Sequence, residues 1–335
     1  MGQAHRAGLK INTMKKYLII ASILAFANFS FAGTNGGLAG AFSRMGAGAR
    51  AKGLGGAFTG VGQGAAAVYF NPGALPFGEG REFTANMSRL ALDRTLHYLA
   101  FATPVRPKAG PEKRVVNAGV GLAWLHAGVS NIDARDFDGL PMDQIDQSSN
   151  LFMFAFGVQL HDKVGLGVTA KMNYDTYGRI GNGNASVHGN GFGADAGVFV
   201  KPIERLSVGA QAKDIGVKTT WSTVDYWDQG SSKPDKWPAQ YRVGAAYTYS
   251  WLLGALDVES SQERETKLHA GIEAARQITD KQSIAGRVGY DGGAINFGLG
   301  VGFAFWKVHS SLDFVYTLEN ITPDDATTLG WSVKF

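Results

Sequence analysis

The feature of this sequence that most constrains its fold is an alternation, residue by residue, between bulky apolar side chains and small or polar ones. From Ile295 to Phe305 every second residue is large and apolar, while asparagine, glycine and alanine lie between them. The same period is found at 152–160 and, with one interruption, at 312–318. Successive side chains of a β-strand point to opposite faces, so this period predicts strands.

The second face of the predicted strands decides which kind of β-protein is expected. It is rich in Gly, Ala and Ser, and it also carries charged residues, namely Lys171, Asp195, Arg242, Glu273, Arg287 and Asp313. Soluble barrels and sandwiches turn bulky apolar residues toward a densely packed core, which such a face cannot fill. A transmembrane β-barrel reverses the pattern, with lipid outside and a wet lumen inside. We therefore expect a membrane barrel, with a soluble all-β fold as the alternative.

Fourteen segments are long enough to cross a bilayer as tilted strands, for which about 9–11 residues suffice. They are expected at 82–90, 96–105, 115–128, 150–162, 163–178, 188–202, 205–216, 239–250, 251–263, 266–279, 281–293, 294–307, 308–320 and 326–335. The predicted fold class is all-β, a 14-stranded antiparallel transmembrane outer-membrane β-barrel.

The connections between these segments support the same prediction. Long connections at 129–149, 179–187 and 217–238 alternate with tight turns such as 162–163 and 280–281. Outer-membrane barrels have short periplasmic turns and longer external loops. A last strand ending in phenylalanine also resembles the assembly signal of these barrels. The expected location is the outer membrane of a Gram-negative bacterium, with its lipids as the surroundings of the barrel.

The first 32 residues are interpreted as a secretory signal peptide and not as part of the fold. Lys15 and Lys16 precede an apolar run at 17–29 and a small-x-small cleavage site at 30–32. Such a run is too short to span a bilayer. Residues 1–13 are interpreted as an over-extended start. The remaining chain has 28 basic and 28 acidic residues, so no basic surplus indicates nucleic acid as a partner.

Residues 33–80 lack the alternation and are rich in glycine, which allows close approach of backbones. A segment of this length is too short for a domain of its own. We expect it to fold as a hatch inside the lumen, with residues 81–335 forming the transmembrane barrel.

Two motifs in this segment give it a family resemblance. The stretch GAGARAKGLGGAF at 46–58, followed by AAAVYFNPGAL at 65–75, resembles the PorV/PorQ group of the FadL-like outer-membrane transporter superfamily. An acidic pair of the family pattern is missing around 62–64, and NPAGL is written NPGAL. The hatch or lumen residues carried over by position are Arg50, Gly53, Gly55, Gly56, Phe58, Tyr69, Asn71 and Pro72.

The resemblance implies two functions. FadL-like members pass hydrophobic small molecules, so a hydrophobic ligand is one expected partner. PorV-like members hold the C-terminal domains of secreted proteins in type IX secretion, so a secreted protein is the other. A structural barrel is a third possibility. For Asn71-Pro72, a turn that seats the hatch and a direct ligand contact both remain open.

Two long loops carry candidate binding residues. The loop 217–238 holds four aromatic residues, expected to be exposed and to bind a partner or cover the barrel mouth: Trp221, Tyr226, Trp227 and Trp237. Aromatic residues are enriched in the cores of interfaces. The loop 129–149 is acidic, and its carboxylates are a weak calcium candidate beside the simpler interpretation as a solvated loop: Asp133, Asp136 and Asp138.

Catalytic and cofactor sites are not expected. The chain has no cysteine, which excludes thiolate-ligated metals and thiol catalysis. The histidines after the leader lie on different predicted strands or loops without metal-ligand spacing: His97, His126, His161, His188, His269 and His309. No nucleophile-elbow motif is present. The protein is predicted to be neither an enzyme nor the carrier of a cofactor.

Overall fold

The structure, a computed structural model, describes residues 37–107, 116–142, 144–180, 185–224, 229–319 and 324–335. The predicted signal peptide lies outside these residues. The first eight strands are β1 (Glu82–Arg89), β2 (Arg94–Val105), β3 (Ala118–Ile132), β4 (Ile145–His161), β5 (Val164–Ile180), β6 (Ala185–Ile203), β7 (Leu206–Ile215) and β8 (Lys218–Ser222). The others are β9 (Ser232–Lys236), β10 (Gln240–Tyr249), β11 (Leu252–Ser261), β12 (Arg264–Thr279), β13 (Gln282–Asp291), β14 (Ala294–Phe305), β15 (Val308–Leu318) and β16 (Ala326–Lys334).

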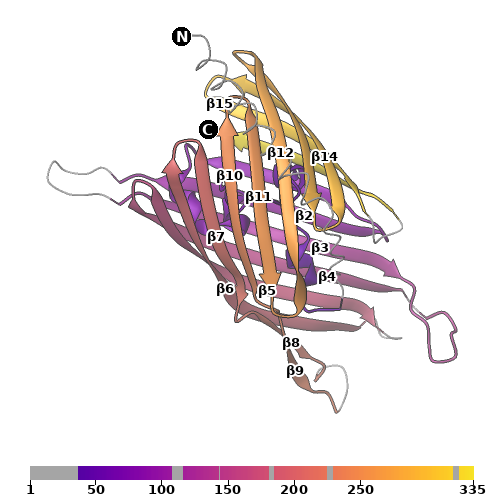
Figure 1. Ribbon diagram of the computed structural model, residues 1–335. Coiled ribbons are helices and arrows are strands. Elements are labelled where there is room, and N and C mark those ends of the chain that lie inside the picture. Colours follow the sequence, from indigo (N-terminus) through magenta and orange to yellow (C-terminus); the bar gives the residue numbers. More distant parts are fainter. Residues whose placement is uncertain (1–36, 108–115, 143, 181–184, 225–228, 320–323) are drawn as a thin grey trace, which may run out of the picture. The chain divides into compact units, whose positions relative to one another are not determined.

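Fourteen of these strands form a closed antiparallel ring (Figure 1). Strands β1 to β7 pair in chain order, β7 pairs with β10, and β10 to β16 again pair in order. The pairing of β1 with β16 joins the two ends of this series. The predicted fold class is therefore confirmed. Closure leaves no free sheet edge in lipid, where an unpaired backbone group costs several kcal/mol.

Strands β8 and β9 lie outside the ring and were not predicted. They form a hairpin within the segment expected to be an irregular loop, and β8 pairs with β6 at 188–190. The described part of the 217–238 connection therefore includes a hairpin that extends the barrel wall at β6.

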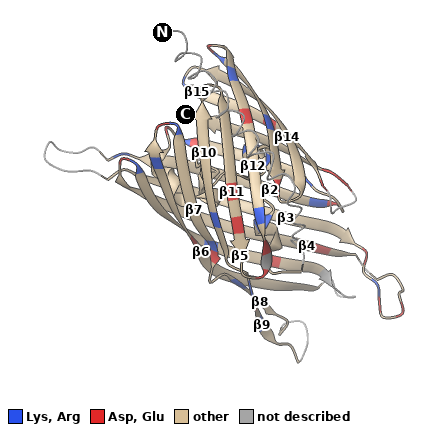
Figure 2. Cartoon of the chain, viewed as in Figure 1, with Lys and Arg blue, Asp and Glu red and all other residues tan. Residues whose placement is uncertain are grey.

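The two faces of the wall differ as the alternation predicts. Bulky side chains such as Leu122, Phe154 and Leu299 are about half exposed on the outer face. The inner face buries the charged residues named above, and Figure 2 shows charges along the strands as well as at the connections. Among the described residues, no helix has the length and apolar content needed to span a bilayer.

The ring has two unlike ends. One end of the ring holds the start of β1 and the end of β16. We call it the short-turn end, because its connections are brief, as at 162–163 and 306–307. The connection 106–117 is the exception there. The opposite end carries the connections 133–144 and 216–239 and is called the long-loop end.

Residues 37–80, called the N-terminal segment below, form short helical turns that contact the inner face of the ring. They are η2 (Ala41–Arg44), α2 (Ala49–Gly53), α3 (Ala67–Phe70) and η3 (Pro72–Phe77). Their apolar residues join inward side chains such as Leu125 and Leu151 in one buried cluster. The lumen at this level is therefore packed, because the small inward residues leave room for the segment.

Candidate functional site: the lumen and its N-terminal segment

Backbone groups of the segment and of the barrel hold the turn Asn71–Leu75 in place. Asn71 is fully buried, and its Nδ2 donates to the carbonyl oxygens of Thr59 at 3.1 Å and Val198 at 2.9 Å. Its Oδ1 accepts from the Gly73 amide at 3.1 Å, which caps η3 at the position where Pro72 begins it. All three side-chain hydrogen bonds of Asn71 are therefore made to backbone groups of the protein.

A set of barrel glycines makes this seat possible. They lie in the short-turn halves of neighbouring strands, and we call them the glycine floor: Gly119, Gly157, Gly165, Gly167, Gly197 and Gly209. A Cβ on Gly167 would lie 2.3 Å from the carbonyl carbon of Pro72, and one on Gly165 would lie 2.2 Å from the Gly73 oxygen. Only glycine allows the segment's backbone to lie this close to the strands.

The opposite side of the ring binds the segment with charge. We call its inward residues the charged wall: Arg242, Asp257, Glu259, His269, Glu273, Arg287 and Asp313. Arg50 of α2 forms an ion pair of 2.7 Å with Glu273, which also accepts from Arg287 at 2.6 Å. Arg287 in turn pairs with Asp313 at 2.6 Å. This series of ion pairs links the N-terminal segment to β12, β13 and β15.

Backbone groups of the segment meet the same wall. Asp257 accepts the amides of Phe58 at 3.1 Å and Thr59 at 2.9 Å. Arg242 donates to the carbonyl oxygen of Gly56 at 3.0 Å and pairs with Glu259. Hydrogen bonds that involve an ionised group are roughly twice as strong as neutral ones. The inward charges are thus paired, although the sequence suggested charges in open water.

Gly55 shows why the glycine-rich motif is needed at this wall. Its φ is +64°, and a Cβ there would lie 2.3 Å from the backbone oxygen of Tyr290. The left-handed backbone and the close approach both exclude other residues.

A further polar cluster, separate from the charged wall, lies nearer the long-loop end. Lys171 is buried and forms ion pairs of 2.7 Å with both Asp195 and Asp214. Tyr69 of α3 lies beside this cluster, because Lys213 Nζ is 3.4 Å from the centroid of its ring. The Tyr69 hydroxyl donates to the Ser43 oxygen at 2.6 Å, which joins α3 to η2.

A cavity of about 730 Å³ lies on the long-loop side of the segment. Apolar side chains of the segment and of the strand ends line much of it: Leu38, Phe42, Met45, Leu90, Tyr177 and Trp221. The lining also includes eight polar or charged side chains, among them Arg94, Gln147, Asp175 and Asp235. Small-molecule sites combine apolar and aromatic walls with polar groups that orient the ligand.

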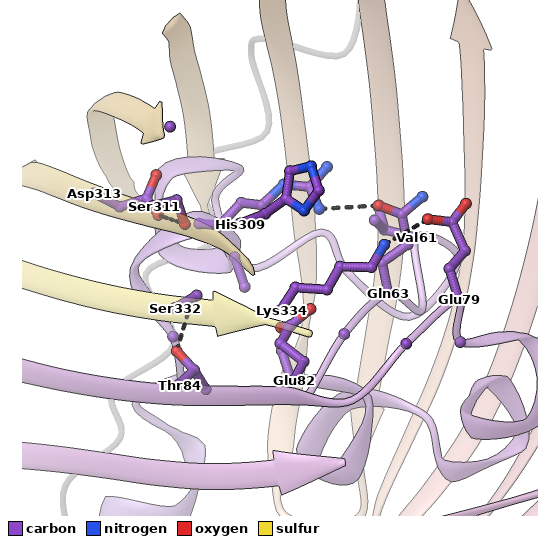
Figure 3. A pocket seen from close by; sticks show the side chains of 18 of the residues that line it. Val61, Gln63, Glu79, Glu82, Thr84, His309, Ser311, Asp313, Ser332 and Lys334 are labelled. Carbon is purple, nitrogen blue, oxygen red and sulfur yellow. Dashed lines mark hydrogen bonds and ion pairs between the residues drawn. The ribbon is translucent and has the colours of Figure 1, made fainter. Parts of the chain in front are cut away.

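A second cavity, of about 430 Å³, lies on the short-turn side and is more polar (Figure 3). Figure 3 shows Glu79 and Lys334 meeting at its rim, where their ion pair is 2.5 Å long. The hydrogen bond from Lys334 lowers the pKa of Glu79 below its usual value. Glu82 accepts from the Ala65 amide at 3.0 Å and so ties β1 to the segment. The segment separates two cavities of different polarity.

Lys52 belongs to the glycine-rich motif at 46–58, and its pKa is strongly lowered in the lumen. Burial lowers it to about 8, although Asp291 and Glu319 lie close enough to oppose the shift. Its Nζ donates to Ser88 at 3.0 Å.

The sequence-predicted residues of the segment come together as packing and hydrogen-bonding groups. Arg50 pairs with Glu273, and Gly53 lies against Arg287. Gly55 and Gly56 meet β12 and β13, and Phe58 and Tyr69 pack on Phe70. Sequence reasoning missed the glycine floor. The sequence does place glycines at inward positions of neighbouring strands. These glycines indicate a contact surface only when the register of the strands is known.

The predicted aromatic loop is only partly exposed. Trp237 is 4% exposed, packs edge-on against Phe42 and donates to Thr219 at 3.0 Å. The expectation that it is exposed was wrong, because the loop folds back as a hairpin and turns this side chain toward the segment. Trp221 packs beside Tyr177, with ring centroids 5.4 Å apart. Tyr226 and Trp227 lie outside the described residues.

The described carboxylates of the acidic loop, which leave out Asp143, do not converge. Asp133 pairs with Arg135 at 2.8 Å, and Asp136 accepts the backbone amides of Asp138 and Leu140. In the part of the chain that the structure describes, no group of three or more His, Cys, Asp or Glu side chains has metal-site geometry.

Comparison with known proteins finds solved structures with a similar fold. No family model and no curated protein sequence matches the chain. Among solved structures, the Pseudomonas putida toluene transporter TodX matches with a TM-score of 0.58 at 13% identity, covering 87% of this chain and 99% of TodX. The Ralstonia pickettii toluene transporter TbuX gives 0.57 at 14% identity, with 86% and 97% covered. A Pseudomonas aeruginosa FadL homologue gives 0.52 at 12% identity, with 80% and 92% covered.

These likenesses concern the fold. The chain shares with these proteins the fold of a closed antiparallel β-barrel. Two of these neighbours are described as toluene transporters and the third as a FadL homologue.

Proposed function

We propose that this barrel transports hydrophobic small molecules across the outer membrane, with the N-terminal segment acting as a hatch. The observation that carries the proposal is the apolar-lined cavity of about 730 Å³ directly on the long-loop side of the segment. A molecule captured there contacts the segment itself, through Phe42 and Met45. The fold supports the same function, since toluene transporters share it.

In the proposed mechanism, capture at the long-loop end precedes a shift of the hatch and release toward the short-turn end. Phe42 packs against Trp237, and Gly40 lies so near that an added Cβ would be 2.2 Å from the Trp237 ring. A ligand that displaces Phe42 therefore loosens a contact that the segment makes with the β8–β9 hairpin. The polar second cavity then provides a wet exit.

The test measures binding and conduction separately. Toluene serves as the apolar probe, and binding to purified protein in detergent is followed by calorimetry. Phe42→Asp introduces a charge into the cavity and is expected to weaken binding at least tenfold, since an unpaired charge is costly in an apolar site. Phe42→Leu is the matched control, and it should bind within about threefold of the parent protein.

Conductance in planar bilayers tests the hatch. Protein without residues 33–80 is expected to conduct, while the parent protein stays largely closed. Equal, closed behaviour of both proteins contradicts the hatch. Unchanged toluene binding in Phe42→Asp contradicts the ligand site.

A second candidate, the type IX secretion role of PorV/PorQ barrels, draws on a separate feature. Phe137 is fully exposed in the connection between β3 and β4, and Leu140 and Met142 are exposed beside it. Such a tip suits docking of a secreted protein domain. Copurification of a secreted protein with the parent barrel, and its loss in Phe137→Ser, would support this role.

A further inference from the structure

The outer face of β1 to β3 brings together three side chains that the sequence keeps apart. Met87 is the direct cross-strand partner of His97, and His97 is the direct partner of His126. All three point outward, because their chain neighbours Leu96, Tyr98 and Leu125 are buried in the lumen. Directly opposed residues of antiparallel strands have Cβ atoms about 4.5–5.5 Å apart. Two imidazoles and one thioether thus form a continuous row.

The row lies where water reaches it. The next outward residues toward the short-turn end are apolar, such as Leu99 and Trp124, whereas Thr95 and Gly128 follow toward the long-loop end. His97 and His126 are partly exposed, and Met87 is 43% exposed. The row therefore marks the edge of the apolar belt and is separate from both lumen cavities.

The spacing of the two imidazoles suits one shared ion. Their ring centroids are 5.7 Å apart. A metal bound through a ring nitrogen at about 2.0–2.1 Å lies about 3.2 Å from the centroid. One ion held by two rings therefore separates the centroids by about 4.5 Å at a ligand angle of 90° and about 6.4 Å at 180°. The observed separation falls between these limits.

Asn150 orients one of the rings for this purpose. Its Oδ1 accepts from the Trp124 indole at 3.1 Å and lies 3.0 Å from His126 Nδ1. An indole N–H is only a donor, so the atom it meets is the acceptor, and His126 must carry its proton on Nδ1. The Nε2 lone pair is then left for a metal. Histidine ligands are commonly fixed in this way by a hydrogen bond from the other ring nitrogen.

We propose that Met87, His97 and His126 form a copper-binding site on the outer face of the barrel. Imidazole suits copper, thioether sulfur selects Cu⁺ in particular, and Cu²⁺ is the tightest-binding divalent ion of the first transition row. No carboxylate belongs to the row, so calcium and magnesium are poor occupants. Water completes the coordination of Cu²⁺.

Cu²⁺ titration of the detergent-purified protein, produced without a histidine tag, tests the site. Calorimetry should give one tight site, and His97→Ala or His126→Ala should weaken it at least tenfold. His188→Ala is the matched control, since His188 lies on the outer face of β6 beside Tyr174 and outside the row; it should change nothing. Met87→Ala should weaken the binding of Cu⁺, measured under ascorbate, more than that of Cu²⁺.

Electron paramagnetic resonance of the unmodified protein decides the question without relying on any variant. Coupling of Cu²⁺ to two imidazole nitrogens is the expected spectrum. A spectrum without two such nitrogens, or equal affinity in the parent protein and the His97→Ala, His126→Ala double variant, overturns the proposal.

Discussion

The glycine floor and the charged wall hold the same segment in opposite ways. On the floor, the backbone of Asn71–Leu75 lies directly on strands that have no side chains to interfere. On the wall, Arg50, Gly56 and the amides of residues 58 and 59 meet ionised groups. A backbone contact depends on shape alone, whereas a buried ion pair depends on both partners keeping their charge. The floor is therefore sensitive to the size of a residue, and the wall is sensitive to the loss of a charge.

The largest expected effect comes from breaking the wall at its centre. Arg287→Ala removes the partner of Asp313 and one of the two partners of Glu273, and should cost about 3–5 kcal/mol because buried charges are left uncompensated. Urea unfolding followed by the heat-dependent gel shift measures the loss. Arg287→Lys is the control, which keeps the charge and should recover part of the stability. An unchanged midpoint for Arg287→Ala would mean that the wall contributes little.

The floor should respond to size and not to charge. Gly167→Ala forces a methyl group against the Pro72 carbonyl and is expected to cost about 1–3 kcal/mol, with faster proteolysis of the segment. Gly286→Ala is the matched control, because an added Cβ there meets nothing within 4 Å. Equal proteolysis of the two variants would contradict the role of the glycine floor in holding the segment.

A third expected effect is a dependence of stability on pH at Lys52. Burial lowers its pKa to about 8 from the usual 10.5. Between these values the unfolded chain binds a proton that the folded chain does not, so stability rises with pH across this interval. Below about pH 8 both states are protonated and the burial cost is fully present. Urea midpoints at pH 7 to 10 should rise more steeply in the parent protein than in Lys52→Met, and identical slopes would contradict the assignment.

Much of the barrel could be predicted because one face had to meet lipid. The alternation at 294–307 and 308–320 gave strands that end within two residues of β14 and β15. The β8–β9 hairpin was missed, since 217–238 has no clear period, and its pairing with β6 follows from that strand's extra length. Trp237 was expected outside for the same reason.

By itself, the sequence determined the number of strands in the ring, their outward and inward faces and the presence of a glycine-rich segment. The period of two and the exclusion of charge from lipid are local requirements, so they can be read without the tertiary structure. Only the tertiary structure decided what the inward residues meet. Gly167 and Pro72 lie far apart in the chain, as do Arg50 and Glu273, and the register of the closed ring alone brings each pair into contact. The same register places His97 opposite His126, which no spacing in the sequence could reveal.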